Sequence, residues 1–436
     1  MKRATLTDVL LINAYWFGLS FMWNSLHVII LPAVLLHLVP DSLKNTYLGL
    51  LTAFGLVIAM IVQPISGAVS DRWQSRWGRR RPLILIGTAF DFVFLAFLGW
   101  SGGLVWVAIG YIGLQLSSNT AHGPTQGLLP DRIPANQMGW ASGFKNLLDM
   151  SGVVASALLV GHLLSPETRH PIGVIGLVSI LLAAGAAVTL LGVHEASSLN
   201  DKMPKGGNSS KSDKTRSGNS WKDLLHVDFR ANSSYWWLIL SRFFFLTGVY
   251  GIQVFAQYYV RDVLAAPNPI ELTGNLLAAI TLSLIVFAIM GGWLGDRLGH
   301  KRILLFASGL GALGCLLLLW ARTPATLLAF GSILGIGIGL FLTANWALAS
   351  QLAPLVEAGK FLGLTNLATA GAGALSRLEG PAIDILNNAR PGTWMGYTML
   401  FLFGGFCILV SALLLRRVQT MKTATDTWQE SSIPID

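Results

Sequence analysis

Charged residues are scarce in this sequence. Asp, Glu, Lys and Arg make up 12% of the 436 residues, whereas hydrophobic residues make up 53%. Because soluble domains carry roughly a quarter charged residues, this composition argues against a soluble globular protein. The mean hydropathy of +0.60 points the same way. The composition therefore predicts a protein that lies largely within a membrane.

Cysteine is also nearly absent. The two cysteines, Cys315 and Cys407, both lie in apolar stretches, so the sequence predicts neither a disulfide framework nor a cysteine metal site. The sequence also lacks metal-ligand spacing, a nucleophile constellation and a phosphate-cradling loop. We therefore expect no metal, no cofactor and no enzymatic activity, and direct drive by ATP is disfavoured.

Long apolar stretches account for most of the chain. A membrane-spanning helix needs about 20 mainly apolar residues, and the first stretch is far too long for the core of a signal peptide, so we expect it to be a retained helix. The sequence predicts an all-α polytopic membrane protein with twelve transmembrane helices. The predicted spans are residues 8–38, 46–69, 82–100, 104–129, 139–164, 171–193, 235–260, 271–293, 302–320, 325–351, 361–386 and 393–415.

The basic residues predict how the helices are oriented. With the N-terminus inside, most of the 30 Lys and Arg residues fall in cytoplasmic segments, as the positive-inside rule requires. We expect a bacterial-type plasma membrane protein with both termini cytoplasmic. The net charge of +9 then reflects topology, and nucleic acid is not an expected partner. The predicted external loops hold Lys44, Arg169, Arg261, Arg322 and Arg390.

One long polar segment divides the chain. Residues 194–233 are rich in Gly, Ser, Asn and Lys, which is typical of a flexible linker. Six predicted spans precede it and six follow it. We therefore expect an N-terminal six-helix bundle over residues 1–193, a cytoplasmic linker over 194–233, a C-terminal bundle over 234–415 and a cytoplasmic tail over 416–436.

The two halves repeat a short signature after their second predicted span. Gly67 and Asp71 in the first half correspond to Gly292 and Asp296 in the second, and a glycine followed by basic residues comes next in each. Such duplication is typical of transporters that rock one half against the other. We expect Gly67 to let helices 2 and 3 approach closely, and the acid to pair with arginines or to cap a neighbouring helix end. Such contacts would hold the cytoplasmic ends of the halves together in one state and release them in the other. The predicted gating residues are Gly67, Asp71, Arg72, Arg76, Gly78, Arg79, Arg80, Asp296, Arg297 and Gly299.

A simpler interpretation of this signature is a charge cluster that only sets topology. The duplicated acid favours gating over that alternative. The pattern Gly-x-x-x-Asp-Arg followed by Gly-Arg-Arg resembles the loop signature of the major facilitator superfamily. This resemblance implies the major facilitator fold of two six-helix halves and transport by alternating access.

The first half resembles one branch of that superfamily more closely. The extended copy from Asp71 to Pro82, with Val62–Ile65 before it, is similar to the glycoside–pentoside–hexuronide:cation symporters, and most similar to their sucrose carriers. Trp23 and Pro32 match the spacing of that family in helix 1. Helix 4 agrees through Asn119, Gly123-Pro124 and the following Leu128-Leu129-Pro130-Asp131.

Four positions depart from these relatives. The resemblance implies two acids near the end of helix 2 for a coupling cation, but this sequence has Ala59 and Gln63 there. It also implies an acid and an arginine in helix 4, where Gln115 and Gln126 stand. Because glutamine cannot carry a proton, these departures leave sugar recognition more intact than proton symport.

Polar and aromatic side chains form stripes at helical spacing. Such groups are costly against lipid, so we expect the stripes to face a central cavity between helices 1, 4, 7 and 10, as the resemblance also implies. Amides suit hydroxyl groups and aromatic rings suit the apolar faces of sugars. Helix-to-helix packing is the alternative for each residue. The predicted substrate-binding residues are Trp16, Trp23, Asn24, His27, Gln115, Asn119, His122, Gln126, Arg242, Tyr250, Gln253, Gln257, Asn345 and Trp346.

Two acids within predicted spans are candidates for proton coupling. Asp91 lies near the middle of helix 3 and Asp149 near the middle of helix 5. Lys145 precedes Asp149 by four residues, so a local ion pair is an equally supported role for Asp149. Arg377 and Glu379 point to different sides of helix 11, and we expect them to pack or gate near the kink at Gly380-Pro381.

These patterns favour a secondary transporter that moves a small polar solute, preferably a sugar or glycoside similar to sucrose or maltose, with proton symport left open. The expected partners are the solute, the lipid bilayer and, if coupling exists, protons. An exporter of amphiphilic or drug-like compounds is the main alternative, and an anionic cargo that binds Arg242 is another. A non-transporting membrane receptor or assembly factor is disfavoured, because it has no need of two gating loops.

Overall fold

The computed structural model describes residues 3–195, 197–199, 232–353 and 358–419, and these residues form helices and connecting turns without a strand. Most of the predicted linker and tail lies outside them. In the first half, the helices are α1 (Leu6–Asn24), η1 (Ser25–Ile30), α2 (Leu31–Leu35), η2 (Asp41–Leu43), α3 (Lys44–Arg72), α4 (Arg81–Trp100), α5 (Leu104–Arg132), η3 (Ala135–Gln137), α6 (Met138–Leu163) and α7 (Ile172–Gly192). In the second half, they are α9 (Ser233–Asp262), α10 (Pro269–Leu298), α11 (His300–Leu318), α12 (Pro324–Leu352), α13 (Ala358–Arg377), α14 (Glu379–Ala389) and α15 (Met395–Arg416).

These helices confirm the predicted all-α fold with twelve crossings. Ten spans are long and apolar enough to cross a membrane by composition alone. The polar stripe of α5 lowers its mean hydropathy, and the eleventh crossing is divided into α13 and α14 at Leu378, close to the predicted kink at Gly380-Pro381. Hydropathy therefore located the spans. The hydropathy signal is weakest in α5, which carries polar side chains, and in the divided eleventh crossing.

The first crossing contains a local irregularity that the hydropathy did not predict. A π-helical turn, η1, separates α1 from α2 and precedes Pro32 at the start of α2. A proline removes a backbone donor and disturbs the helical hydrogen bonds before it, and π-turns are frequent at functional sites. This turn carries His27, which is one of the predicted substrate-binding residues.

Close approach in the first half occurs between α3 and α5. A Cβ atom added to Gly123 would lie 2.5 Å from the carbonyl oxygen of Gln63 and 2.8 Å from the nitrogen of Gly67. The expectation that Gly67 brings helices 2 and 3 together was therefore wrong, because its close neighbour is helix 4. Paired glycines allow two backbones to approach in a membrane bundle, where packing contacts replace the hydrophobic effect.

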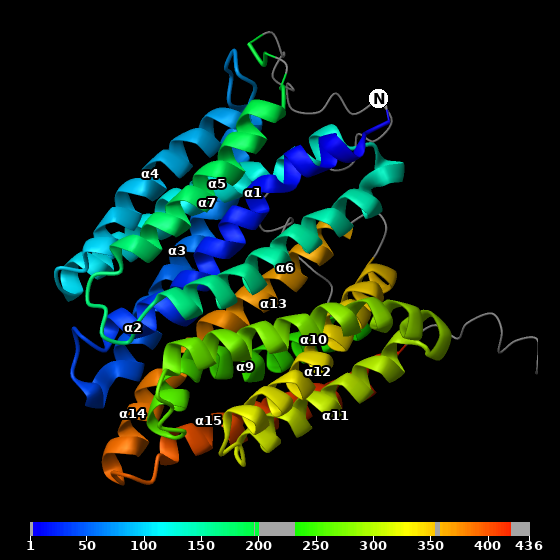
Figure 1. Cartoon of the computed structure of the whole chain (residues 1–436). Helices are drawn as coiled ribbons and strands as arrows, with labels where there is room; N and C mark the ends of the chain where they lie inside the picture. Colours follow the sequence, from blue (N-terminus) through cyan, green and yellow to red (C-terminus); the bar gives the residue numbers. More distant parts are fainter. Residues whose placement is uncertain (1–2, 196, 200–231, 354–357, 420–436) are drawn as a thin grey trace, which may run out of the picture.

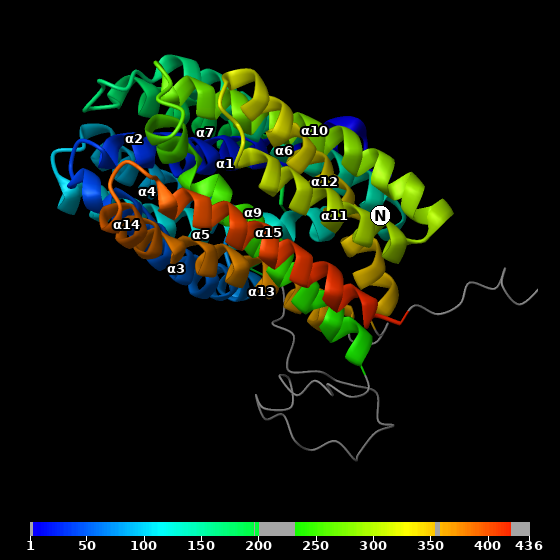
Figure 2. The ribbon, with the colours of Figure 1, turned by 90° about the horizontal axis from the view of Figure 1, so that it is seen from below.

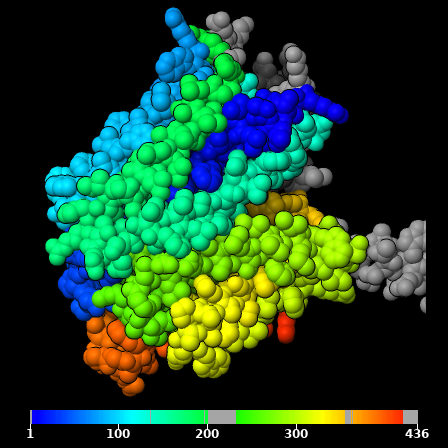
Figure 3. Space-filling view, viewed as in Figure 1, coloured from blue at the N-terminus to red at the C-terminus, as the bar shows by residue number. Residues whose placement is uncertain are grey.

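The two halves meet along two pairs of helices. At one contact, α3 packs on the divided crossing formed by α13 and α14. At the other contact, α6 packs on α10. Glycines permit both contacts: a Cβ on Gly380 would lie 2.2 Å from the carbonyl oxygen of Asn45, and one on Gly274 would lie 2.3 Å from that of Ala157. Figure 1 shows the two halves converging near α2 and α14 and spreading toward the end that bears the N-terminus. Figure 3 shows α6 and α10 side by side across the surface.

The view from below places α9 in the interior of the bundle, with α3, α13 and α15 around it (Figure 2). Most of α9 is buried, from Tyr235 to Val260. A helix that is enclosed in this way can present polar side chains to other helices instead of lipid. It therefore contributes to the central cavity as well as to the core of the second half.

Candidate functional site

The two ends of the bundle carry different polar groups. We call the end at which α3 passes into α4 and α10 passes into α11 the signature end, because it holds both copies of the repeated motif. We call the other end, where α3 begins and α9 ends, the latch end. The central cavity lies between them.

In the first signature copy, the arginines hold two acids of the same half. Arg80 pairs with Asp71 at 2.6 Å and with Asp131, the last acid of α5, at 3.0 Å. Arg79 also pairs with Asp131, at 2.7 Å, and this contact raises the pKa of the Arg79 guanidinium. Arg80 donates a further hydrogen bond to Ser70 at 2.6 Å. The cluster therefore ties the ends of α3, α4 and α5 together.

A further acid caps α4 at the same place. The carboxylate of Glu195 accepts hydrogen bonds from the backbone nitrogens of Arg80 and Arg81, at 3.0 and 3.2 Å. The backbone of Gly78 is left-handed, with φ of 91°, and a Cβ there would lie 2.2 Å from the Glu195 side chain. An acid at a helix N-terminus is favourable, because it satisfies free backbone donors. Gly78 is therefore required both by the turn and by the space.

The second signature copy has the same backbone turn with weaker contacts. Gly299 has φ of 90°, as Gly78 has 91°. Asp296 lies 3.6 Å from His300 with its side chain 79% exposed, and the Arg297 guanidinium lies over the ring of Trp293 at 4.1 Å. In the described residues, each recorded polar contact of both copies stays within its own half. Arg72 and Arg76 are exposed at this end.

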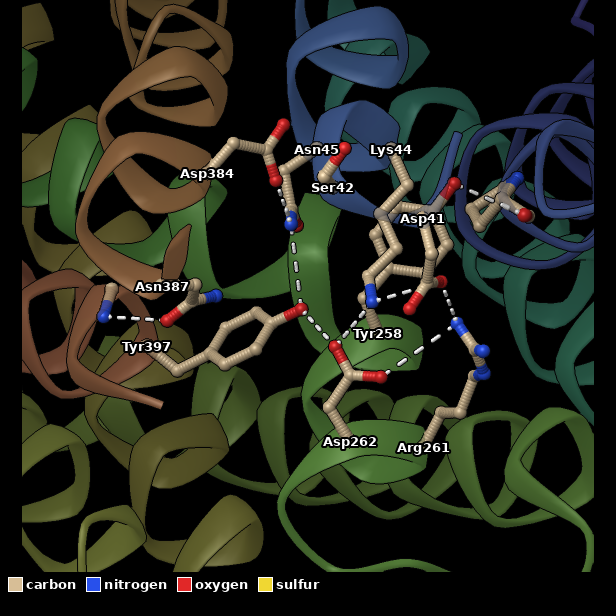
Figure 4. A network of polar contacts seen from close by, with 12 residues as sticks. Asp41, Ser42, Lys44, Asn45, Tyr258, Arg261, Asp262, Asp384, Asn387 and Tyr397 are labelled. Carbon is tan, nitrogen blue, oxygen red and sulfur yellow. Dashed lines mark hydrogen bonds and ion pairs between the residues drawn. The ribbon is translucent and has the colours of Figure 1, made fainter. Parts of the chain in front are cut away.

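The latch end joins the two halves by ion pairs, one buried and one exposed, as Figure 4 shows. Lys44, at the start of α3, lies 2.6 Å from Asp262, at the end of α9, and both side chains are less than 5% exposed. Asp41 accepts a hydrogen bond from Arg261 at 2.6 Å. Tyr397 of α15 donates to Asp262 at 2.7 Å. A buried ion pair is unfavourable to separate unless each charge finds a new partner.

One acid of the second half caps a helix of the first. Asp384, in α14, accepts a hydrogen bond from the amide of Asn45 at 2.8 Å (Figure 4). It also accepts from the backbone nitrogen of Thr46 at 2.6 Å and from the Thr46 hydroxyl at 2.7 Å. The N-cap of α3 is Leu43, whose side chain offers no acceptor. Helix α3 therefore receives its capping oxygen from the other half. In this conformation, the described residues join the halves at the latch end.

The central cavity lies between the halves and brings several predicted residues together. Its larger part has a volume of about 390 Å³ and is lined by Asn24, Asp149, Tyr250 and Gln253, among others. A smaller part of about 260 Å³ shares Asn24, Tyr250 and Gln253 and adds His27. These residues come from α1, η1, α6 and α9. Volumes of this size are typical of small-molecule sites.

A chain of hydrogen bonds runs from His27 into α5. The His27 Nε2 lies 2.8 Å from the Tyr111 hydroxyl, to which the Gln115 amide donates at 2.7 Å. The Asn119 amide donates to the Gln115 oxygen at 3.1 Å. Trp23 stacks on His27 with ring centroids 5.1 Å apart. Gln115 thus bonds to both Asn119 and Tyr111, and Tyr111 in turn contacts His27.

The rest of the predicted helix 4 stripe lies nearer the signature end. His122 meets the Trp16 ring edge to face at 5.0 Å, and the Lys145 ammonium lies 3.9 Å from the centre of that ring. Lys145 also lies 3.8 Å from Asp149, so the local pair that the spacing allowed is present. Gln126 is exposed. Asp149 faces the cavity while this lysine partly neutralises it.

On the second half, Arg242 and Asn345 bind each other. Arg242 donates to the Asn345 oxygen at 2.9 Å and to the Thr369 hydroxyl at 2.9 Å. Gln257 reaches the carbonyl oxygens of Val28 and Ile29 at 3.0 Å when its amide nitrogen faces them. Trp346 is 44% exposed. Gln257 therefore satisfies carbonyls of the π-turn, which is a packing role.

Asp91 lies inside the first half, fully buried between α4 and α5. Ser117 of α5 donates a hydrogen bond to one carboxylate oxygen of Asp91, and the other oxygen is without a recorded partner in the described residues. The recorded partner of Asp91 is therefore a hydroxyl of a neighbouring helix. Arg242 does not pair with this acid, because it binds Asn345 and Thr369.

Comparison with known proteins decides the family. The model of the Major Facilitator Superfamily matches residues 5–377, which is most of the chain. The chain belongs to the major facilitator superfamily. It is therefore a multi-pass membrane transporter of that superfamily. The solved structure of a variant of the nucleoside transporter NupG has the same fold, with a TM-score of 0.71, 14% identity, and coverage of 94% of this chain and 100% of that one.

Two groups of relatives are named for different functions. The multidrug resistance protein MdtG of Serratia proteamaculans is 26% identical over 315 residues, which cover 69% of this chain and 68% of that protein. The sucrose transport protein SUT1 of Oryza sativa subsp. japonica is 32% identical over 100 residues, which cover only 18% of each. The similarity to a sucrose carrier is thus higher but much shorter.

Sequence reasoning missed several residues that this superfamily member uses to join its halves. Asp41, Asp262, Asp384 and Tyr397 were not predicted to act together. A weak signal existed, since Asp41 precedes Lys44 by three residues and Arg261 is adjacent to Asp262, all in predicted external segments. Asp384 had no such signal, because its partners are more than 330 residues away.

Proposed function

We propose that this protein transports a small polar solute, a sugar or glycoside, by alternating access. The observation that carries the proposal is the cavity between the halves, where Asn24, Gln253, His27 and Tyr250 supply hydrogen-bonding groups beside aromatic rings. Amides and imidazoles exchange hydrogen bonds with hydroxyl groups, and rings cover the apolar face of a sugar. The short similarity to a sucrose carrier supports this substrate class.

The same proposal assigns roles to the two ends. The latch end is the external gate, which is closed in this conformation by Lys44, Asp262 and Asp384. The signature end is the cytoplasmic gate, whose gating residues engage the opposite half when the transporter faces outward. The positive-inside distribution of basic residues supports this orientation in a bacterial-type plasma membrane.

Proton coupling is assigned to the two membrane acids. Asp149 faces the cavity and lies 3.8 Å from Lys145, so a bound proton would change the local charge beside the solute. Asp91 is more deeply buried and is bound to Ser117. Gln115 stands where the family resemblance implies an acid. Asp149 is therefore the acid that contacts the cavity.

The test is uptake of labelled sucrose and maltose into proteoliposomes, with and without an inward proton gradient. Accumulation above the external concentration is expected with the gradient, and Asp149→Asn should reduce uptake to equilibration. The matched control is Glu167→Gln, which removes an exposed acid outside both the cavity and the gating residues. Failure of folded protein to take up either sugar would contradict the sugar assignment.

A second function is favoured by one specific observation. The larger cavity has an apolar wall on the second half, formed by residues that include Leu246, Leu276, Ile280 and Leu334. An apolar wall suits amphiphilic compounds, and the longer similarity to MdtG supports export of such compounds. Efflux of ethidium from preloaded cells would distinguish the two functions, because a sugar carrier leaves ethidium efflux unchanged.

A further inference from the structure

One arginine of the second half lines the cavity, and a second arginine lies behind a threonine that lines it. Arg377, the last residue of α13, lines the smaller part beside His27 and Tyr250. Thr369 lines the same part and accepts a hydrogen bond from Arg242 at 2.9 Å. Arg377 and Arg242 are each 8% exposed, so two positive charges lie buried at one wall of the cavity.

Neither arginine has a carboxylate partner among the described residues. The ion pairs recorded there include neither Arg377 nor Arg242. Arg377 donates one hydrogen bond, to the carbonyl oxygen of Gly373 in its own helix at 2.7 Å, and its Nε is buried without a partner. A guanidinium carries five donors and remains charged, so this group has unused capacity for an anion.

The nearby acids are directed elsewhere. Glu379 lies two residues after Arg377 but faces α9, where a Cβ on Gly251 would lie 2.4 Å from its Oε2. Asp149 lines the larger part of the cavity and lies 3.8 Å from Lys145. Burying an uncompensated charge is costly, and two like charges at one wall increase that cost. A bound anion would offset it.

We propose that the transported solute carries an anionic group, a carboxylate or a phosphate, which pairs with Arg377. A guanidinium binds both groups through two parallel hydrogen bonds. Arg242 adds a second positive charge behind Thr369, to which it donates a hydrogen bond. Asn24, His27 and Gln253 remain for the hydroxyl groups of the solute. This inference rests on the proposed transport function and makes polyhydroxy anions the preferred substrates, with neutral sugars bound more weakly at the same site.

Matched pairs of solutes test the anionic group directly. Gluconate and sorbitol differ only in a carboxylate, and glucose 6-phosphate and glucose only in a phosphate. Binding of each to the purified full chain is measured by calorimetry at low ionic strength. The anion of at least one pair should bind roughly 10- to 100-fold more tightly than its neutral partner, as expected for charge-assisted hydrogen bonds. Which pair responds distinguishes a carboxylate site from a phosphate site.

Variants locate the site of that preference. Arg377→Gln should abolish the preference for the anion while Arg377→Lys retains part of it, since lysine keeps the charge but not the paired donors. Arg390→Gln removes the same charge from an exposed turn outside the cavity and should change nothing. The lysine variant keeps the test valid if the glutamine variant fails to fold.

Several results would overturn the inference. Equal affinity within both pairs, or no binding by any of the four solutes, would show that the cavity does not select an anion. A preference that survives Arg377→Gln would place the anion elsewhere. Sucrose uptake measured on the same preparation separates the two proposals: uptake without any gluconate preference refutes only this inference, and gluconate preference without uptake refutes only transport of neutral sugars.

Discussion

At the scale of single residues, the first signature copy is organised around Arg80. This side chain binds Asp71, Asp131 and Ser70 together, so three helices of the first half depend on one guanidinium. The second copy has no equivalent contact among the described residues, because Asp296 is largely exposed. The duplicated sequence thus supports two different local structures, and its two acids should differ in importance.

Asp71→Ala should slow exchange of solute and leave equilibrium binding nearly unchanged. The variant removes the 2.6 Å pair with Arg80 at the signature end, whereas the binding residues lie in the cavity. We expect a reduction of roughly tenfold in the rate, in line with loss of one charge-assisted contact. Counterflow in proteoliposomes gives the rate and calorimetry gives the affinity.

The matched control for this residue is Asp296→Ala in the second copy. It should lower the exchange rate less, because Asp296 has only His300 nearby in the described structure. Loss of binding by folded Asp71→Ala would contradict the gating role. An equal effect of both variants would contradict the asymmetry between the copies.

At the scale of helices, glycines set the distance between neighbours. Gly123→Ala should destabilise the protein by about 1–3 kcal/mol, because its Cβ would lie 2.5 Å from the Gln63 carbonyl and α3 and α5 would have to separate. Thermal unfolding in detergent measures the change. Gly143→Ala is the control, since no atom lies within 4 Å of its added Cβ, and it should have no such effect. Similar unfolding temperatures for both would contradict close packing at Gly123.

The capping of α3 by the opposite half leads to a second prediction at this scale. Asp384→Ala removes three accepted hydrogen bonds and should weaken the closed latch by roughly 1–2 kcal/mol, the usual effect of losing an N-cap. Labelling of Val39→Cys, a buried position in the turn before α3, by a membrane-impermeant maleimide should then become faster, and both native cysteines are buried. Asn388→Ala, which loses one bond to the Ser42 carbonyl, serves as the milder comparison. Unchanged labelling in Asp384→Ala would exclude a capping role.

The sequence predicted where each helix lies along the chain better than how each helix is rotated about its own axis. Hydropathy located the twelve crossings because each needs a long apolar stretch, and proline marked the region of the break at Leu378. The same helical spacing placed Asn24 and Gln253 in the cavity but Gln115 and Asn119 in a hydrogen-bonded chain behind it. The way each helix turns about its axis depends on glycine contacts with other helices, and a single sequence does not reveal these.

At the scale of the whole molecule, the two halves are joined at one end. Lys44 and Asp262 lie buried between the halves and are separated by 218 positions in the sequence, so no local pattern could pair them. Opening this end must expose both charges to water or provide new partners. Within the part of the chain that the structure describes, the signature residues have no recorded contact with the opposite half, which is the arrangement that alternating access requires when the latch end is closed.

Exchange of the paired charges tests this interface. Lys44→Asp alone should place a third acid beside Asp41 and Asp262. Transport should fall severely, because like charges are then buried together. The double variant Lys44→Asp with Asp262→Lys should recover part of the rate. Transport is measured as initial uptake in proteoliposomes. Absence of any recovery in a folded double variant would indicate that the pair does not act as a unit.

The central claim is that the halves must separate at the latch end for transport to occur. Ser42 and Asn388 are exposed and meet across the two halves, with the Asn388 amide 2.8 Å from the Ser42 carbonyl oxygen. The decisive measurement is uptake of labelled sucrose by Ser42→Cys/Asn388→Cys before and after cross-linking with a short, reducible bifunctional thiol reagent. The account predicts that cross-linking stops uptake and that reduction restores it, while each single-cysteine variant is unaffected. Uptake at full rate by the cross-linked protein would contradict alternating access at this gate.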